Sequence, residues 1–255
     1  MKIKSAADIA GLIELGVLHS EVVAALTAMV RPGTTTDALE EAACALIAER
    51  GCTPAFKNYR PSGAARAFPC ALCVAPNDVV VHGIPTEMHY TLKDGDIIGL
   101  DVGLVKNGLV IDAGKTVPCG NIDKAAQKLL HVTQEALMLG IAEARAGNHV
   151  GDIGNAIETY VRKEGYGLVR DLCGHGVGHA VHEEPQVPNY GAPHMGDKLV
   201  AGMVLAIEPM VNEGKGQVDF LSDGYTVKTR DGSRSAHFEH NVVITEGEPV
   251  ILTKW

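Results

Sequence analysis

Histidines and glycines alternate in residues 173–190, which read CGHGVGHAVHEEPQVPNY. His175, His179 and His182 are separated by glycines and followed by two glutamates at 183–184. Glycine costs about 1 kcal/mol relative to alanine inside a helix, but it lets the backbone approach closely or adopt positive φ. Imidazoles on such a backbone suit a site where side chains converge on a metal ion or a scissile bond. The alternative is a glycine-rich surface loop with incidental histidines.

A second candidate site lies in a predicted hairpin. Residues 97–105 and 109–113 are strand-like, and Asn107-Gly108 between them is a strong signal for a two-residue turn. This turn fixes the register of the two strands. Alternation then directs the aliphatic side chains of both strands to one face and leaves the other face to aspartates and glycines.

Two aspartates share that second face. The register places Asp101 opposite Gly114 and Asp112 opposite Gly103, which makes the aspartates diagonal neighbours roughly 7–8 Å apart at Cα. Like charges beside open space raise each other's pKa unless a cation lies between them. A solvent-exposed hairpin face is the alternative, but exposed faces seldom pair Asp among glycines. We therefore predict a divalent metal site.

Two glutamates interrupt apolar segments further along the chain. Glu208 ends VLAIE at 204–208, and Glu239 lies within SAHFEHNVVI at 235–244. A buried carboxylate without a partner is costly, so each glutamate is expected to have a cation beside it.

Composition limits the class of protein. The chain has 255 residues, 46% of them hydrophobic and 21% charged, and a net charge of −9. This is a globular composition, and the negative charge argues against direct binding to nucleic acid phosphates or anionic membranes. We find no signal-peptide pattern and no apolar run of the ~18–20 residues that a membrane span needs. A soluble, cytoplasmic protein is expected, with its six cysteines reduced.

A helical pattern occurs twice. Residues 9–29 and 38–49 have helical periodicity, and an offset of 114 residues aligns them with residues 123–143 and 152–163. Three landmarks recur at this offset: Arg31 with Arg145, Gly33 with Gly147, and Gly51 with Gly165. Chance similarity between amphipathic helix pairs is the alternative to an internal duplication. A duplication predicts one catalytic domain over 1–255, whose αα-β halves, roughly 1–120 and 121–255, meet at a site.

These segments, together with VVVHGIP at 79–85, resemble type I methionine aminopeptidases, the short bacterial form within the pita-bread metallopeptidase family. The resemblance runs from the first helix to Glu246. It implies an α+β pita-bread fold with two pseudo-symmetric αα-β halves, an antiparallel sheet core and helices outside.

The resemblance also implies a centre of two divalent ions, Co, Mn, Fe or Zn. In this assignment Asp101 binds one ion, His175 and Glu208 bind the other, and Asp112 and Glu239 bridge them. Such a pair holds and deprotonates a water, polarises the scissile carbonyl and orients the substrate amine.

Three residues are expected to act on the substrate. Glu208 is implied as the general base or proton shuttle, His182 as the contact to the scissile carbonyl, and His82 as the contact to the peptide nitrogen beyond it. His179 occupies a variable position of the family motif and receives no role.

The remaining implied sites are a methionine pocket and a monovalent cation site. The pocket draws on Phe68, Cys73 and Tyr225, and a Na⁺ or K⁺ site draws on Asn77, Val79 and Ser235. Three residues depart from the usual family pattern: His237 replaces Gln, Tyr225 replaces Trp, and Val181 replaces Phe. The loop in the 60s is also longer than usual. His237 is expected to tune the metal from outside the ligand set, and the other changes affect selectivity.

The expected function is removal of initiator methionine from nascent chains with a small second residue, near the ribosome, by a monomeric enzyme. One alternative is a proline-directed or other aminopeptidase of the same fold. Such enzymes usually carry an extra N-terminal domain, which we do not expect here. Another alternative is a catalytically silent binding scaffold. A silent scaffold predicts broken ligands, and all five ligand candidates are present.

Overall fold

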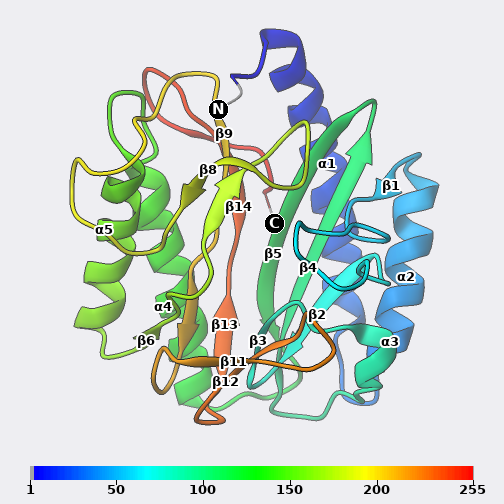
Figure 1. Ribbon diagram of the computed structural model, residues 1–255. Coiled ribbons are helices and arrows are strands. Elements are labelled where there is room, and N and C mark those ends of the chain that lie inside the picture. The colour runs from blue at the N-terminus through cyan, green and yellow to red at the C-terminus, as the bar shows by residue number, and fades with distance from the viewer. Residues whose placement is uncertain (1–2, 255) are drawn as a thin grey trace.

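The computed structural model describes residues 3–254, and its strands lie between two pairs of helices (Figure 1). The helices are α1 (Ala6–Met29), α2 (Thr36–Glu49), α3 (Pro85–Met88), α4 (Lys124–Ala142) and α5 (Val150–Lys163). The strands are β1 (Thr53–Pro54), β2 (Leu72–Pro76), β3 (Val79–Val81), β4 (Ile97–Lys106), β5 (Leu109–Pro118), β6 (Gly167–Leu168), β7 (Gly174–Gly176), β8 (Glu183–Val187), β9 (Val204–Ile207), β10 (Met210–Asn212), β11 (Val218–Phe220), β12 (Val227–Thr229), β13 (Ser235–His237), β14 (His240–Val243) and β15 (Val250–Ile251). The paired strands are antiparallel, as the α+β prediction requires.

The 114-residue offset also appears in the element boundaries. Helices α2 and α5 begin and end at equivalent positions, and so do the short strands β1 and β6. Gly33 and Gly147, which break the helix pairs, have nearly equal φ values of 93° and 98°. In this left-handed region a side chain is strained, so glycine is required at both breaks. A common origin of the two halves stays a prediction.

The β4–β5 hairpin has the predicted register. Asp101 pairs with Gly114 and Asp112 with Gly103, around the turn at Asn107-Gly108. The opposite face of the hairpin packs against α1. There the buried ring of His19 approaches the backbone oxygens of Val102 at 2.9 Å and Ala113 at 3.2 Å. Helix α1 is therefore fixed directly behind the strand positions that carry the aspartates.

Helix α1 requires a correction to the sequence analysis. Its 24 residues have the length and composition of a membrane span, with a mean hydropathy of 1.7 over the most apolar window. In the fold, however, Leu12, Leu15 and Leu26 are buried in the protein core. The apolar side chains of α1 therefore pack against the β4–β5 hairpin.

Candidate metal centre

Most of the residues predicted to bind metal or substrate line one cavity of about 650 Å³. The predicted site residues that line it are Phe68, Cys73, His82, Asp101, Asp112, His175, His182, Glu208, Tyr225 and Glu239. They come from both halves of the chain. Residues 1–120 and 121–255 therefore both contribute to the cavity.

Three carboxylates on the floor of the cavity carry buried oxygens without a hydrogen-bond partner among the described residues. Asp101 Oδ1, Asp112 Oδ1 and Glu239 Oε1 have no hydrogen-bond partner among the described residues. Burial raises the pKa of all three carboxyls, and repulsion among the carboxylates raises those of Asp112 and Glu239 further. Buried oxygens of this kind are normally satisfied. The residues present therefore fit a divalent cation.

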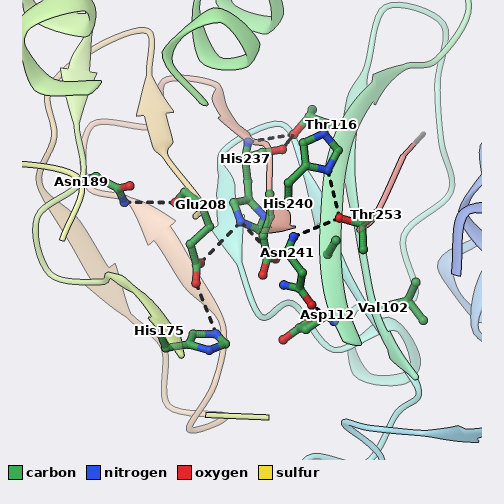
Figure 2. A network of polar contacts seen from close by, with 12 residues as sticks. Val102, Asp112, Thr116, His175, Asn189, Glu208, His237, His240, Asn241 and Thr253 are labelled. Atoms are coloured by element: carbon green, nitrogen blue, oxygen red, sulfur yellow. Dashed lines mark hydrogen bonds and ion pairs between the residues drawn. The ribbon is translucent and has the colours of Figure 1, made fainter. Parts of the chain in front are cut away.

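His175 is oriented as a metal ligand. Its Nδ1 lies 3.0 Å from the carbonyl oxygen of Gly176, to which it donates a hydrogen bond when it carries the proton. The lone pair of Nε2 then faces the cavity, where Glu208 Oε1 lies 3.5 Å away (Figure 2). Such a hydrogen bond fixes the tautomer and ring orientation of metal-binding histidines.

The candidate ligand atoms form two groups. Asp112, His175 and Glu239 make one group, and Asp101, His237 and Glu239 make the other, with ligand atoms within 4.8 Å of one another in each. The groups share Glu239, whereas Asp112, the other residue expected to bridge the ions, belongs to one group only. They also place His237 beside Asp101, at a position where the sequence analysis expected only an indirect influence.

The pKa of Glu208 shifts in the opposite direction to those of Asp101, Asp112 and Glu239. Burial alone would raise its pKa, but the neighbouring His237 and His175 rings lower it overall. Figure 2 shows its side chain between these two rings. Glu208 is therefore held as a carboxylate, a suitable state for accepting a proton.

Strand β5 joins the two halves at the carboxylates. The backbone N–H of Glu239 donates to the backbone oxygen of Gly114 at 2.8 Å. The backbone N–H of Asp112 donates to the side-chain Oδ1 of Asn241 at 2.8 Å (Figure 2). These two bonds fix the backbones of Asp112 and Glu239 relative to each other. Asn241 was not predicted, although its position two residues after Glu239 places it on the same strand face.

Glu183 orders the glycine-rich turn. Its Oε1 accepts hydrogen bonds from the backbone of His179 at 2.6 Å and Ala180 at 3.0 Å. Its Oε2 lies 2.7 Å from Lys4 Nζ in a buried ion pair. The turn that separates His175 from His182 is thus tied to the N-terminal segment. The sequence analysis noticed Glu183 but assigned it no role, because its partner lies far away in the chain.

His182 stands on the wall of the cavity. Its Nδ1 lies 2.8 Å from the Tyr59 hydroxyl, and its ring centroid is 4.4 Å from that of His175. Although the side chain is exposed to the cavity, the surrounding wall and the His175 ring lower its pKa to about 4. The imidazole is therefore neutral at pH 7. Tyr59 was missed, because the loop that carries it has no periodicity.

His82 lies at the end of β3 with a left-handed φ of 59°. The next residue, Gly83, packs so closely that an added Cβ would be 2.1 Å from the carbonyl oxygen of Val74. This close approach directs the half-buried His82 ring into the cavity. Burial lowers the pKa of His82, so this ring too is neutral.

The comparisons with known proteins agree with this arrangement. Residues 10–246 match the model of metallopeptidase family M24. The chain is 46% identical to a methionine aminopeptidase of Clostridium perfringens over 238 residues, 93% of this chain and 92% of that protein. It is also 46% identical to methionine aminopeptidase 1 of Bacillus subtilis over 225 residues, 88% of each chain. The chain belongs to the methionine aminopeptidases of family M24.

Solved structures support the same assignment. The methionine aminopeptidase of Rickettsia prowazekii superimposes with a TM-score of 0.95 at 36% identity, covering 100% of both chains. An Xaa-Pro dipeptidase from Bacillus anthracis has a TM-score of 0.77 at 19% identity, and the match covers 62% of that chain, so it shows the fold alone. The predicted family and the pita-bread fold are confirmed.

The expected methionine pocket of this M24 member is lined by aromatic and sulfur side chains. The Phe68 and Tyr225 rings meet edge to face at 5.1 Å, and the buried Cys73 pairs in register with Asp101. Burial raises the pKa of Cys73 well above its usual value, which keeps it a neutral thiol. Val181, the smaller residue found in place of Phe, also lines the cavity.

The predicted monovalent site has no such support. The side chain of Asn77 is occupied, because its Nδ2 donates to Asp96 at 2.9 Å and its Oδ1 accepts from Ile97 N at 3.2 Å. Ser235 N donates to the Asn77 carbonyl oxygen, so that oxygen too has a partner. A site at Asn77, Val79 and Ser235 therefore rests on the family resemblance alone.

Proposed function

We propose that this protein removes the N-terminal initiator methionine from nascent polypeptides whose second residue is small. The observation that carries the proposal is the group of unpaired buried carboxylate oxygens on the floor of a cavity with neutral histidines on its wall. The floor suits divalent ions, and the wall suits a peptide held by hydrogen bonds. Membership of the methionine aminopeptidases supports the choice of reaction.

Asp101, Asp112, His175, Glu208 and Glu239 would hold two divalent ions in this proposal. Mn²⁺, Fe²⁺, Co²⁺ and Zn²⁺ suit such a set of oxygen and imidazole ligands. When bound, the ions supply an activated water and polarisation of the scissile carbonyl. Their positive charge also offsets the mutual repulsion of the carboxylates.

Glu208 is proposed to move the proton. Its lowered pKa keeps it ionised, so it can accept a proton from the attacking water and pass it to the leaving amine. Protonation of the leaving amine requires that the proton reach the peptide nitrogen. His82 is proposed to contact that nitrogen. The two residues line the same cavity.

His182 is proposed to donate a hydrogen bond to the scissile carbonyl oxygen. Tyr59 O–H has no other acceptor among the described contacts and so donates to Nδ1 of His182. In a neutral ring this leaves the proton on Nε2. A donor aimed at the developing oxyanion typically contributes a factor of about 10²–10³ to kcat.

Phe68, Cys73 and Tyr225 are proposed to bind the methionine side chain. Thioether sulfur makes favourable contacts with aromatic rings, and the neutral Cys73 thiol adds a small apolar surface. The preference for a small second residue is taken from the family resemblance.

The test is hydrolysis of Met-Ala-Ser, Leu-Ala-Ser and Ala-Pro-Ala by metal-stripped protein, before and after addition of Mn²⁺, Fe²⁺ or Co²⁺. We expect cleavage of Met-Ala-Ser only after metal addition. Turnover that survives chelation would refute the metal mechanism. Cleavage of Ala-Pro-Ala without preference for methionine would instead favour a proline-directed peptidase.

The cellular setting is part of the proposal. Nascent chains as substrates imply action in the cytoplasm near the ribosome, and no direct contact with nucleic acid is needed for it. We further propose that residues 1–255 form a single catalytic domain with duplicated halves, active as a monomer. Sedimentation of the active protein at the mass of one chain would support the last point.

A further inference from the structure

His237 presents a buried nitrogen with no partner. The residue is 3% exposed, and its Nε2 makes no hydrogen bond among the described residues. Its backbone is fixed on both sides by Thr116, whose Oγ1 accepts from His237 N at 2.9 Å and donates to His237 O at 3.0 Å. Leaving a buried nitrogen without a hydrogen-bond partner is unfavourable. The nitrogen is therefore available to bind a metal ion.

The neighbours of Nε2 are carboxylates at a characteristic spacing. Glu208 Oε2 lies 3.6 Å away (Figure 2). Glu239 Oε2 lies 3.8 Å away. Both separations exceed the normal range of a hydrogen bond. For Glu239, the expected bridge between both ions, the separation is slightly above the about 3.0–3.5 Å between two ligands that each lie about 2.1 Å from one ion. The spacing suits coordination better than direct pairing.

The imidazoles of His175 and His237 belong to different groups of candidate ligands. His175 groups with Asp112 and Glu239, whereas His237 groups with Asp101 and Glu239. Each group thus contains one histidine and one aspartate of its own, and Glu239 is common to both. The two histidines approach from β7 and β13, strands of different sheets.

We propose that His237 Nε2 is a direct ligand of the divalent ion on the Asp101 side of the centre. This rests on the proposed function, since it assigns a sixth ligand to the same dinuclear site. Each ion then has one imidazole. An imidazole in place of a purely oxygen environment favours Fe²⁺, Co²⁺ and Zn²⁺ over Mn²⁺ at that position. It also raises the affinity for the second ion.

Two measurements on the whole protein test the assignment, with Co²⁺ as the probe. In the wild type, proton NMR should show one strongly shifted, solvent-exchangeable imidazole N–H signal for each directly bound histidine, and hence two such signals at two equivalents. The His237→Gln variant should lose one of them. Calorimetric titration should show its second equivalent binding about 10–100-fold more weakly, with Zn²⁺ affected more than Mn²⁺.

His179→Gln is the matched control. His179 lies outside the floor, with Nε2 3.5 Å from Asp8 Oδ2, so both shifted signals and both affinities should remain. The wild-type signal count tests the proposal even if His237→Gln folds poorly, because it needs no variant.

Three outcomes overturn the proposal. A single shifted imidazole signal in the wild type at two equivalents would show that His237 is not bound. Equal affinities in wild type and His237→Gln would do the same. A weaker second affinity with an unchanged number of signals would assign His237 an indirect influence, as the sequence analysis expected. In each case Met-Ala-Ser cleavage by the Co²⁺-loaded wild type would leave the proposed function intact.

Discussion

The floor and the wall of the cavity are built in different ways. The metal floor, meaning Asp101, Asp112, His175, Glu208 and Glu239, lies on strands or directly at their ends. The substrate wall, meaning Tyr59, Phe68, His82, His182 and Tyr225, lies outside the helices and strands, with His82 and His182 next to β3 and β8. Backbone N–H groups of Asp112 and Glu239 donate hydrogen bonds between the halves at the floor. Side-chain contacts such as that of Tyr59 with His182 hold the wall.

The difference separates chemistry from selectivity. A ligand set tolerates little displacement, so it lies where backbone pairing fixes every position. A wall on loops can change with fewer consequences for the fold. Tyr225 belongs to the wall and Val181 lines the same cavity, and the resemblance predicts a departure from the family pattern at both positions. His237 is the exception, and it lies beside the floor.

The largest loss of activity is expected from substitutions of the floor carboxylates. Asp112→Ala and Glu239→Ala should each lose bound metal and more than ~10³-fold of kcat/KM, since metal catalysis contributes several kcal/mol. Metal analysis and Met-Ala-Ser hydrolysis measure the two effects together. Glu41→Ala, exposed on α2, is the control and should retain both. Full metal content in either floor variant would contradict the ligand assignment.

A change to the wall should separate metal binding from turnover. His182→Ala should lower kcat by about 10²–10³-fold through loss of the hydrogen bond to the oxyanion, with KM less affected. Its metal content should equal that of the wild type. Loss of metal in this variant would show that His182 contributes to metal binding rather than to substrate contact alone.

Tyr59→Phe tests how the wall is oriented. Loss of the hydrogen bond to His182 Nδ1 should lower kcat about 5–10-fold, because such a bond contributes about 1–1.5 kcal/mol. Nitrogen NMR of the His182 ring should show a mixture of tautomers in place of one. Tyr225→Phe is the control, because its hydroxyl bonds to the oxygen of Arg66 instead. An unchanged tautomer in Tyr59→Phe would refute the orienting role.

The smallest effect on activity is expected from His19, which packs on the opposite face of the β4–β5 hairpin and whose substitution is expected to change the pH dependence of stability. Burial lowers its folded pKa to about 4 from an ordinary value near 6.5. The unfolded chain therefore binds the extra proton first, and stability falls as the pH decreases from about 6.5 to 4. His19→Gln should be less stable at pH 7 but lose less stability over that range. Urea unfolding of metal-free protein at pH 4.5 and 7 measures this.

His131→Gln is the matched control for that experiment, since His131 is an exposed residue of α4. It should show the same pH dependence as the wild type. If His19→Gln also shows an unchanged slope, the acid sensitivity belongs to other groups.

The sequence by itself determined the local features. The Asn107-Gly108 turn fixed the register of β4 and β5 and therefore the shared face of Asp101 and Asp112. Paired breaks at Gly33 and Gly147 located the helix pairs, because only glycine adopts their backbone conformation without strain. These signals lie within a few residues of the structures they predict. The unpaired carboxylates were inferred in the same way, from charge in an apolar segment.

Only the tertiary structure decided how distant segments meet. It buried one side of α1 in the core, paired Lys4 with Glu183, and brought Tyr59 into hydrogen-bond contact with His182. It also left the Nε2 of His237 unpaired beside Asp101 and Glu239. No local periodicity encodes these contacts, and all except the packing of α1 depend on the docking of one half of the chain against the other. That docking places a ligand-like nitrogen where the sequence alone indicated only a neighbour.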